Sequence, residues 1–337
     1  MSRKSTAHTK LDFGKSGKQT GFVYIPQSPH NDAWGAVPIP MAIIANGDGP
    51  TVILQGGNHG DEYEGPITIG ELIRDLDPGE VQGRIICLPA INVPAVNAGR
   101  RVSPVDGLNM NRTFPGDPAG TITQQISAFV NDQILPLGDA FLDLHSGGSS
   151  LDILPSAIIE PAPDPEHHRR NAAAVLAFGA PLVVVIDNLG EARTSTAASV
   201  RAGLTTVGTE MAGRGTVSLD ALAICRRGAR NVLAHLGVLE PQGPAPERPE
   251  TVLTIPGPPG YVYSPTDGVF EGFHSLGSEV RAGQEAGRVH HLTDPFHPPE
   301  TLYYGAGGIL YGRRQPGRVE PGNCCAVVAA PYEGDLP

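Results

Sequence analysis

The sequence predicts an α/β protein whose mixed, mainly parallel sheet is flanked by helices, followed by a smaller all-β domain. Two observations predict this. Short apolar runs rich in β-branched residues alternate with segments of helical period up to about residue 240. After that point, glycine, proline and short alternating segments dominate. Strands that alternate with helices form a mainly parallel sheet, because each parallel connection needs a long crossover that covers a face of the sheet.

The expected elements of the α/β part follow from these patterns. Strands are predicted at residues 51–54, 84–88, 140–144, 182–186 and 205–209, and helices at residues 65–77 and 123–135. In a sheet of this kind the ligand crevice lies beyond the carboxyl ends of the strands, where the connecting loops meet. Polar motifs that directly follow an apolar run are therefore the first candidates for a functional site.

Residues 1–240 are expected to form the catalytic domain, including an N-terminal β extension. Residues 241–252 are rich in proline and polar residues and are predicted to be a linker. Residues 253–337 should form the β-domain, and within it the stretch from Ser264 to Val289 resembles the barrel of lipoyl and biotinyl carrier domains. Those domains carry their cofactor on a lysine, whereas every lysine here lies within the first 18 residues. A packing or lid role is expected instead.

Composition excludes several classes of partner. The net charge is −11 and no extended basic block occurs, so nucleic acid is not expected to bind. No run of about 18 apolar residues occurs, and residues 1–21 lack the apolar part of an export signal, which predicts a cytoplasmic protein without a membrane partner. The four cysteines show no CxxC spacing, so a thiolate metal site is not indicated. A homo-oligomer is left open.

Four polar, glycine-flanked motifs stand out: NHGDE at 58–62, NMNR at 109–112, DLHSGG at 143–148 and TEMAG at 209–213. His59 and Glu62 could form a solvated turn, since charged groups are favoured at a helix start. Alternatively, a strand-to-helix turn places them on one side of the first helical turn, where side chains three apart converge. Catalytic zinc takes three protein ligands of the His and Glu kind and keeps a fourth position open.

His145 is the best candidate for the third ligand, because it ends an apolar strand and would emerge at the same edge of the sheet. The other nine histidines show no compact spacing with an acid and are interpreted as surface or core residues. Asp143 lies two residues earlier and points to the same side of the strand, so it could orient His145 or cap a neighbouring loop.

Taken in order, the four motifs resemble those of the succinylglutamate desuccinylase and aspartoacylase family, zinc amidohydrolases related to the carboxypeptidase A fold. The resemblance covers roughly residues 50 to 213. It implies a zinc-carboxypeptidase-like fold in which His59, Glu62 and His145 bind one zinc ion per subunit. It also implies that Glu210 is the general base and acid, although a carboxylate that only caps a loop is the alternative.

The resemblance also implies residues for the substrate. An arginine ahead of the NMNR motif would stabilise the oxyanion; Arg101 is the candidate, with Arg100 not excluded because this loop is longer than in aspartoacylases. Arg112 resembles the residue that binds the substrate carboxylate, with Asn111 as its partner, and a structural ion pair is the alternative for Arg112. Asn109 stands where the family often has an aspartate, so its orienting role is open.

The extended motif HGDEYEGP and the chain length resemble, within this family, the deacetylases of N-α-acetyl-L-2,4-diaminobutyrate in ectoine breakdown. The resemblance implies removal of acetate from a small N-acyl amino acid. Aspartoacylase-like or desuccinylase-like deacylation of another N-acyl amino acid is the alternative. A non-catalytic metal- or ligand-binding protein of the same fold is a further alternative, but a pure binder has no need for Glu210.

Overall fold

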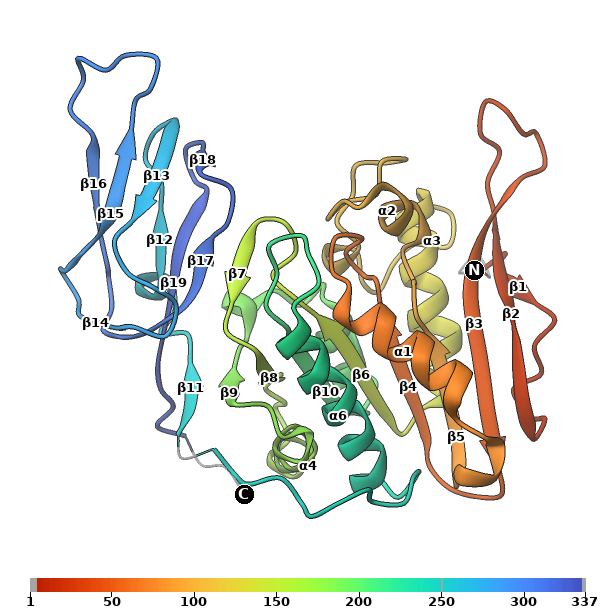
Figure 1. The fold of residues 1–337 in the computed structure, drawn as a ribbon. Coiled ribbons are helices and arrows are strands. Elements are labelled where there is room, and N and C mark those ends of the chain that lie inside the picture. The colour runs from red at the N-terminus through yellow and green to blue at the C-terminus, as the bar shows by residue number, and fades with distance from the viewer. Residues whose placement is uncertain (1–4, 250, 335–337) are drawn as a thin grey trace.

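The computed structural model describes residues 5–249 and 251–334 of the protein (Figure 1). Its helices are α1 (Glu64–Asp75), α2 (Val93–Ala98), α3 (Ile122–Phe129), α4 (Pro165–Phe178), α5 (Ser195–Arg201) and α6 (Leu219–His235). The strands up to residue 240 are β1 (His8–Thr9), β2 (Gly17–Pro26), β3 (Ala36–Asn46), β4 (Thr51–Gly56), β5 (Gly83–Leu88), β6 (Ala140–His145), β7 (Leu151–Ile153), β8 (Ser156–Ile159), β9 (Leu182–Val185) and β10 (Thr205–Glu210).

The remaining strands belong to the C-terminal part. They are β11 (Val252–Thr254), β12 (Tyr261–Tyr263), β13 (Gly268–Gly272), β14 (Glu279–Val280), β15 (Glu285–His290), β16 (Glu300–Tyr303), β17 (Gly308–Arg314), β18 (Arg318–Val319) and β19 (Cys324–Pro331). Two short turns of helix matter for the site, η2 (Met110–Arg112) and η5 (Asn188–Gly190).

The large sheet has a parallel centre and antiparallel neighbours. Its strand order runs β1-β2-β3-β5-β4-β6-β10-β8-β9-β11-β19-β17-β14. Strands β5, β4, β6 and β10 are parallel to one another, whereas β3 and β8 join this group antiparallel. The centre is buried on both faces, which explains why these strands read as continuous apolar runs in the sequence. The predicted α/β class with a mixed, mainly parallel sheet is confirmed.

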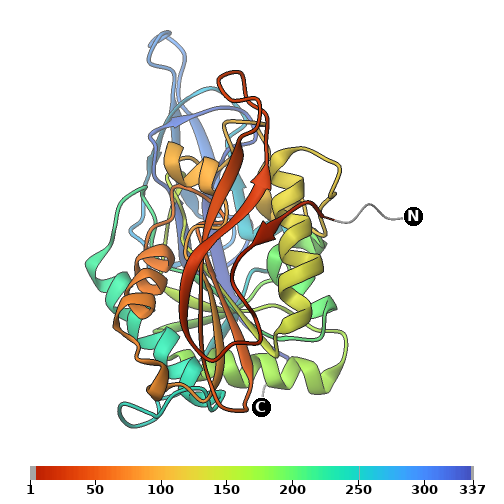
Figure 2. The same cartoon turned by 90° about the vertical axis from the view of Figure 1, so that its right-hand side faces the viewer.

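Helices cover both faces of this sheet, as Figure 2 shows from the side. One hydrophobic core lies between the sheet and α1, α4 and α6, and a second lies between the sheet and α3 and α5. In α1 the buried positions are Glu64, Gly65, Thr68, Ile69 and Leu72, which form a single stripe along the helix. A Cβ atom on Gly65 would lie 2.6 Å from Cβ of Leu144. This glycine therefore lets α1 lie directly against β6.

The C-terminal strands form a separate apolar core around a four-stranded sheet of order β16-β15-β13-β18. This part is joined to the large sheet, because β11 pairs with β9 and β17 pairs with β7. Residues 240–249 contain neither helix nor strand, and β11 begins at Val252, the last residue of the predicted linker. The domain boundaries near residues 240 and 252 remain predictions.

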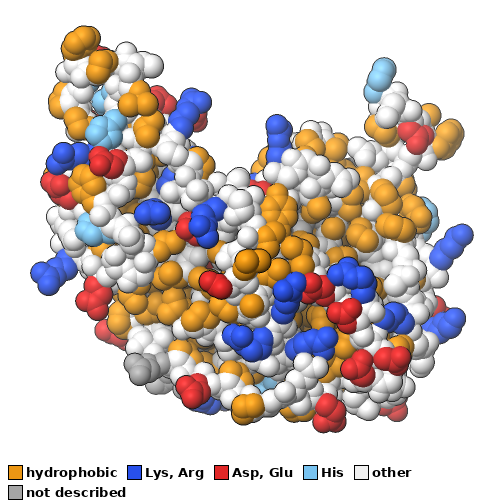
Figure 3. Space-filling view, in the orientation of Figure 1, with side chains coloured by type: hydrophobic (Ala, Val, Ile, Leu, Met, Phe, Trp, Pro, Cys, Tyr) orange, Lys and Arg blue, Asp and Glu red, His pale blue; other side chains and the backbone are white. Residues whose placement is uncertain are grey.

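Figure 3 shows that the surface is hollowed between the C-terminal strands on the left and the body of the molecule. The part of the chain that the structure describes contains no helix that is both long and apolar enough to cross a membrane.

Candidate metal centre

The loop between β4 and α1 carries the first two predicted ligands. β4 ends at Gly56 and α1 begins only at Glu64, so His59 and Glu62 lie in the connection and not in the first turn of the helix. The predicted position of the two residues in the first helical turn is therefore wrong, although their side chains do converge. Nδ1 of His59 lies 2.6 Å from Oε1 of Glu62. A loop achieves this convergence because its backbone turns back on itself after the strand.

Gly60 explains why glycine stands inside this motif. A Cβ atom at this position would lie 2.0 Å from the main-chain carbon and oxygen of Ala95 in α2. The amide of Gly60 also donates to the carbonyl of Arg100, at 2.9 Å. The loop is therefore pressed against the end of α2, and only a residue without a side chain allows such a close approach.

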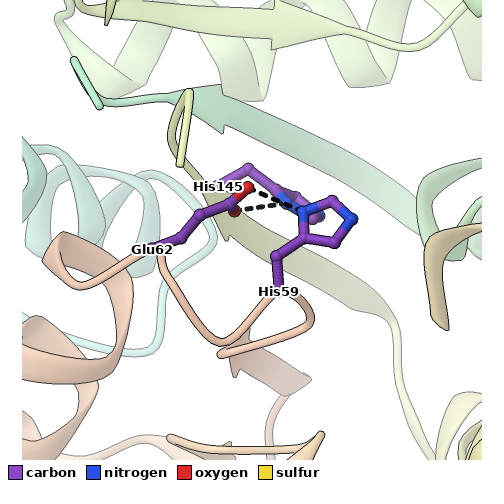
Figure 4. Close-up of side chains that lie close together, drawn as sticks. All are labelled: His59, Glu62 and His145. Atoms are coloured by element: carbon purple, nitrogen blue, oxygen red, sulfur yellow. Dashed lines mark hydrogen bonds and ion pairs between the residues drawn. The ribbon is translucent and has the colours of Figure 1, made fainter. Parts of the chain in front are cut away.

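The third predicted ligand, His145, is the last residue of β6. Because β4 and β6 are adjacent and parallel, with Gly56 opposite Leu144, their carboxyl ends meet at the same edge of the sheet. Nδ1 of His145 lies 2.8 Å from Oε2 of Glu62. One ligand atom from each of the three residues lies within 4.8 Å of the others, and all three residues are buried (Figure 4). Within the described residues, this is the one such group of three metal-ligating side chains.

The outer nitrogen of each imidazole is held by a second polar side chain. Nε2 of His145 donates to Oδ2 of Asp143 at 2.9 Å, and Nε2 of His59 donates to Oδ1 of Asn109 at 3.0 Å. A carboxylate and an amide oxygen can only accept, so each Nε2 keeps its proton. Each Nδ1 faces the carboxylate of Glu62 and is the nitrogen that a bound metal ion would occupy. With Nε2 protonated, both rings can serve as ligands through Nδ1 once any second proton is displaced.

The electrostatics of the three groups suit a cation. Burial alone would raise the pKa of Glu62, but the two adjacent imidazoles outweigh it and hold the pKa below its usual range. Burial lowers the pKa of His59, which favours the neutral ring. Burial would also lower the pKa of His145, yet Asp143 and Glu62 outweigh it and the pKa is raised. Binding of a divalent ion at this point would displace the extra proton of His145.

Glu210 is the last residue of β10, directly opposite His145 in the neighbouring strand. Its Oε2 atom is buried and has no hydrogen-bond partner within the described residues. Burial, followed by the charge of Glu62, raises the pKa of Glu210 to about 7. A carboxyl group with a pKa near 7 and a buried oxygen without a partner can take up and release a proton near neutral pH. The structure therefore brings the predicted acid–base residue to the metal-ligating group.

Of the two candidate arginines, Arg101 approaches the three ligands. Its Nη1 lies 3.7 Å from Oε1 of Glu62 and 3.4 Å from Nδ1 of His59, and 41% of its side chain is exposed. Arg100 is exposed and contacts this region through its main chain, which accepts from Gly60. The guanidinium of Arg101 is thus placed to reach a group bound beside Glu62. Its role in stabilising an oxyanion remains a prediction.

Asn111 and Arg112 lie in the short turn of helix η2. Oδ1 of Asn111 accepts from the amide N of Ser195 at 2.9 Å, so this side chain is held by the start of α5. Arg112 is 36% exposed, and its Nε lies 3.7 Å from Oε2 of Glu191. The guanidinium is therefore accessible, while the side chain of Asn111 supports the loop that carries it.

Two residues of this region escaped the sequence analysis. Ser195 is fully buried; its Oγ donates to Oδ2 of Asp143 and accepts from Nδ2 of Asn58, so it links the support of His145 to the loop of His59. The only sequence signal was a Thr-Ser pair at a helix start. Glu191, beside Arg112, belongs to no motif and could not be found from spacing.

Comparison with known proteins supports this arrangement. The family model described as the succinylglutamate desuccinylase/aspartoacylase catalytic domain matches residues 48–236. The chain belongs to the succinylglutamate desuccinylase/aspartoacylase family. All three ligands, Glu210, and the arginines of the site lie inside the matched range. The resemblance inferred from the four motifs is therefore confirmed.

Members of this family similar to the chain include a curated protein of Halomonas elongata named N-alpha-acetyl-L-2,4-diaminobutyric acid deacetylase. It is 40% identical over 331 residues, which span 98% of this chain and 97% of that protein. The product-bound structure of the ectoine utilization protein EutE (DoeB) from Ruegeria pomeroyi is 38% identical, with a TM-score of 0.93 over 97% of this chain and 100% of that one. The family is one of deacylating enzymes, and the fold of this chain agrees with its solved members.

A further solved member of the family comes from Rhodobacter sphaeroides and is described as a succinylglutamatedesuccinylase/aspartoacylase. It is 42% identical, with a TM-score of 0.91, and covers 97% of this chain and 100% of that one. The similarity extends through the C-terminal strands, so the β-domain is a shared part of these proteins.

Proposed function

We propose that the protein is a zinc-dependent amidohydrolase that removes the acetyl group from the α-nitrogen of N-α-acetyl-L-2,4-diaminobutyrate. The products would be acetate and L-2,4-diaminobutyrate, in the breakdown of ectoine. One observation carries the catalytic part of this proposal: His59, Glu62 and His145 converge beside the unpaired carboxyl oxygen of Glu210. The similarity to the deacetylase of Halomonas elongata and to EutE supports the choice of substrate.

The donor set fits zinc. Two neutral imidazoles and one carboxylate are the ligands of catalytic zinc sites that keep a fourth position for water. Both rings present Nδ1 to the centre because Asp143 and Asn109 hold their Nε2 atoms. Bound there, zinc would supply Lewis-acid activation of a water molecule and of the acyl carbonyl. The chain provides no thiolate at this point that would indicate a softer metal.

The proposed roles of the protein's own groups follow from their places. Glu210 takes a proton from the attacking water and returns it to the departing amine, for which a pKa near neutrality is suited. Arg101, beside Glu62, stabilises the developing oxyanion with its positive charge. Arg112 binds the α-carboxylate of the substrate through parallel hydrogen bonds, and Asn111 holds the turn that presents it.

Two alternatives are tested by the same experiment. An aspartoacylase-like or desuccinylase-like enzyme would prefer N-acetyl-aspartate or N-succinyl-glutamate to N-α-acetyl-diaminobutyrate. A binding protein without turnover would hydrolyse none of the three. Purified protein is stripped with chelator, reloaded with zinc, and offered each substrate, with free amine measured as product. We expect hydrolysis of N-α-acetyl-diaminobutyrate that is lost on stripping and restored by zinc. Full activity after metal removal would show that hydrolysis does not depend on zinc.

A further inference from the structure

Glu191 places a carboxylate beside the arginine assigned to the substrate carboxylate. It lies in the connection between β9 and α5, with its Oε2 3.7 Å from Nε of Arg112. An acid at this distance opposes the binding of an anion, since like charges repel strongly where solvent is partly excluded. Arg193 offsets part of this charge through a bidentate ion pair, but one oxygen of Glu191 still faces Arg112. A negative and a positive group side by side suit a ligand that also carries a positive charge.

The connection that holds Glu191 is fastened at several points. The amide of Phe114 donates to the carbonyl of Arg193 at 3.2 Å, which ties the connection to the chain just after Arg112. Arg201 in α5 donates through Nη1 to the carbonyl of Ala192. The amide of Glu191 itself donates to the carbonyl of Asn188 at 3.3 Å, so the connection is held before and after this residue. A fixed position is what a specificity-determining charge requires.

Arg193 orients the carboxylate and keeps it ionised. Its Nε and Nη2 donate to the two oxygens of Glu191 at 2.8 and 2.6 Å. This hydrogen bonding lowers the pKa of Glu191 to about 2, so the group is negative throughout the range in which enzymes work. Oε1 also accepts from the amide of Arg193 at 3.0 Å, so both of its lone pairs are used, whereas Oε2 can accept a further hydrogen bond. The Glu191 side chain is 19% exposed, which leaves it open to a ligand.

Arg112 likewise retains capacity for a ligand. Its Nη1 donates to the carbonyl of Asn111 at 2.7 Å. Its Nε lies 3.7 Å from Oε2 of Glu191, which is too far for a hydrogen bond. Nη2 of Arg112 has no hydrogen-bond partner among the residues that the structure describes. The guanidinium of Arg112 and the carboxylate of Glu191 thus lie side by side, and each can still form a hydrogen bond with a ligand. Together they match a ligand whose own positive and negative groups are a few bonds apart.

We propose that Glu191 binds the side-chain ammonium of the substrate while Arg112 binds its α-carboxylate, so that the site selects zwitterionic N-acyl diamino acids. This inference rests on the function proposed above and names the specificity-determining residue. In diaminobutyrate four bonds of about 1.5 Å separate the carboxylate carbon from the side-chain nitrogen. The molecule is therefore long enough to reach both groups. An N-acyl dicarboxylate would place a second anion against Glu191.

The test compares three substrates: N-α-acetyl-diaminobutyrate; N-acetyl-norvaline, whose uncharged side chain has the same length; and N-acetyl-glutamate, whose negative side chain extends one atom further. In Glu191→Gln, kcat/KM for the first should fall about 10- to 100-fold, the loss typical of a hydrogen bond to a charged group, and mainly through KM. The value for N-acetyl-norvaline should stay within about threefold, and that for N-acetyl-glutamate should rise. Glu191→Asp, which keeps the charge, should retain much of the preference.

Glu166→Gln is the matched control, because Glu166 forms a comparable ion pair with Arg169 on the exposed surface of α4. It should leave all three values unchanged. Calorimetric binding of free L-2,4-diaminobutyrate and of norvaline to the zinc-loaded protein gives a readout independent of turnover, and only the former should weaken in Glu191→Gln.

Equal losses for all three substrates would assign Glu191 a structural role and overturn the inference, as would an unchanged preference for the diamino acid. A failure of the proposed function would give a different result. If the unaltered protein prefers N-acetyl-glutamate or hydrolyses none of the three, the substrate assignment itself is wrong.

Discussion

Oδ2 of Asp143 lies 2.9 Å from Nε2 of His145, two residues along the same strand, and the carboxylate is completely buried. Gln55 and Ser195 donate to its two oxygens, so Asp143 is itself held in place. A buried acid behind an imidazole fixes the ring and increases its basicity. The direct contact between Asp143 and His145 therefore supports the orienting role that the sequence suggested for Asp143.

Asp143→Asn should weaken zinc binding about 10- to 100-fold, because the negative charge behind His145 is lost while its shape is kept. Competition with a fluorescent chelator measures this affinity. Asp139→Asn is the control: Asp139 precedes the same strand at its other end, accepts from the amide of Thr51, and lies away from the ligands. Equal affinities for Asp143→Asn and the unaltered protein would contradict the role of Asp143.

Asn109 holds His59 in the corresponding way but carries no charge. Asn109→Asp should increase the basicity of His59 and tighten zinc binding several-fold, whereas Asn109→Ala should loosen it. The same chelator competition applies. The decisive result is that zinc affinity rises in one variant and falls in the other, since a purely structural residue would lower the affinity in both. The resemblance drawn from the sequence motifs expects an aspartate at this position, so Asn109→Asp also tests that difference.

Glu210→Gln should retain zinc and lose turnover by about 10² to 10⁴, the range typical of general acid–base groups. The amide is the same size as the carboxyl group but cannot accept a proton. Metal content by elemental analysis and hydrolysis of N-α-acetyl-diaminobutyrate are measured on the same sample. Normal turnover in a zinc-loaded variant would remove Glu210 from the mechanism.

Glu160 predicts a pH dependence of stability that is separate from catalysis. The side chain is buried after β8, where Thr196 donates to it at 3.0 Å, and burial raises its pKa from 4.5 to about 7. Between these two values the folded protein keeps a proton that the unfolded chain has lost. The free energy of unfolding therefore falls as pH rises from 4.5 to 7, by at most about 3 kcal/mol.

Glu160→Gln removes this ionisation, so the variant should gain stability relative to the unaltered protein between pH 5 and pH 8. Urea unfolding at both pH values measures the gain. Glu166→Gln, an exposed change in α4, should show no such trend. A difference between Glu160→Gln and the unaltered protein that is independent of pH would contradict the assignment.

Gly60→Ala should destabilise the protein by about 3 kcal/mol or more, because the added methyl group would overlap the main chain of Ala95. Urea unfolding and zinc content are the measurements, and zinc binding should suffer together with stability because His59 is adjacent. Gly243→Ala is the control, since no atom lies within 4 Å of the added group. Tolerance of both changes would show that the loop can move away from α2.

The local patterns predicted much of the framework. Apolar runs marked β4, β5, β6, β9 and β10 to within two residues at either end, because fully buried strands must be apolar. The helical period likewise predicted α1, which begins one residue before the expected range. The wrong part of the prediction was that His59 and Glu62 share the first turn of this helix, since both lie in the loop before it. The loop motif contains no periodic apolar positions, so the sequence could not predict how its backbone brings the two side chains together.

The sequence by itself determined the chemistry of the site: which imidazoles and carboxylates are present, and that they follow buried strands whose ends meet. Tertiary structure alone decided which of Arg100 and Arg101 faces Glu62, and that Ser195 and Glu191 join the site. Those residues come from separate connections, and their approach depends on main-chain contacts such as Gly60 with Arg100 and Phe114 with Arg193. Such long-range contacts have no period in the sequence, because the packing of whole elements sets them.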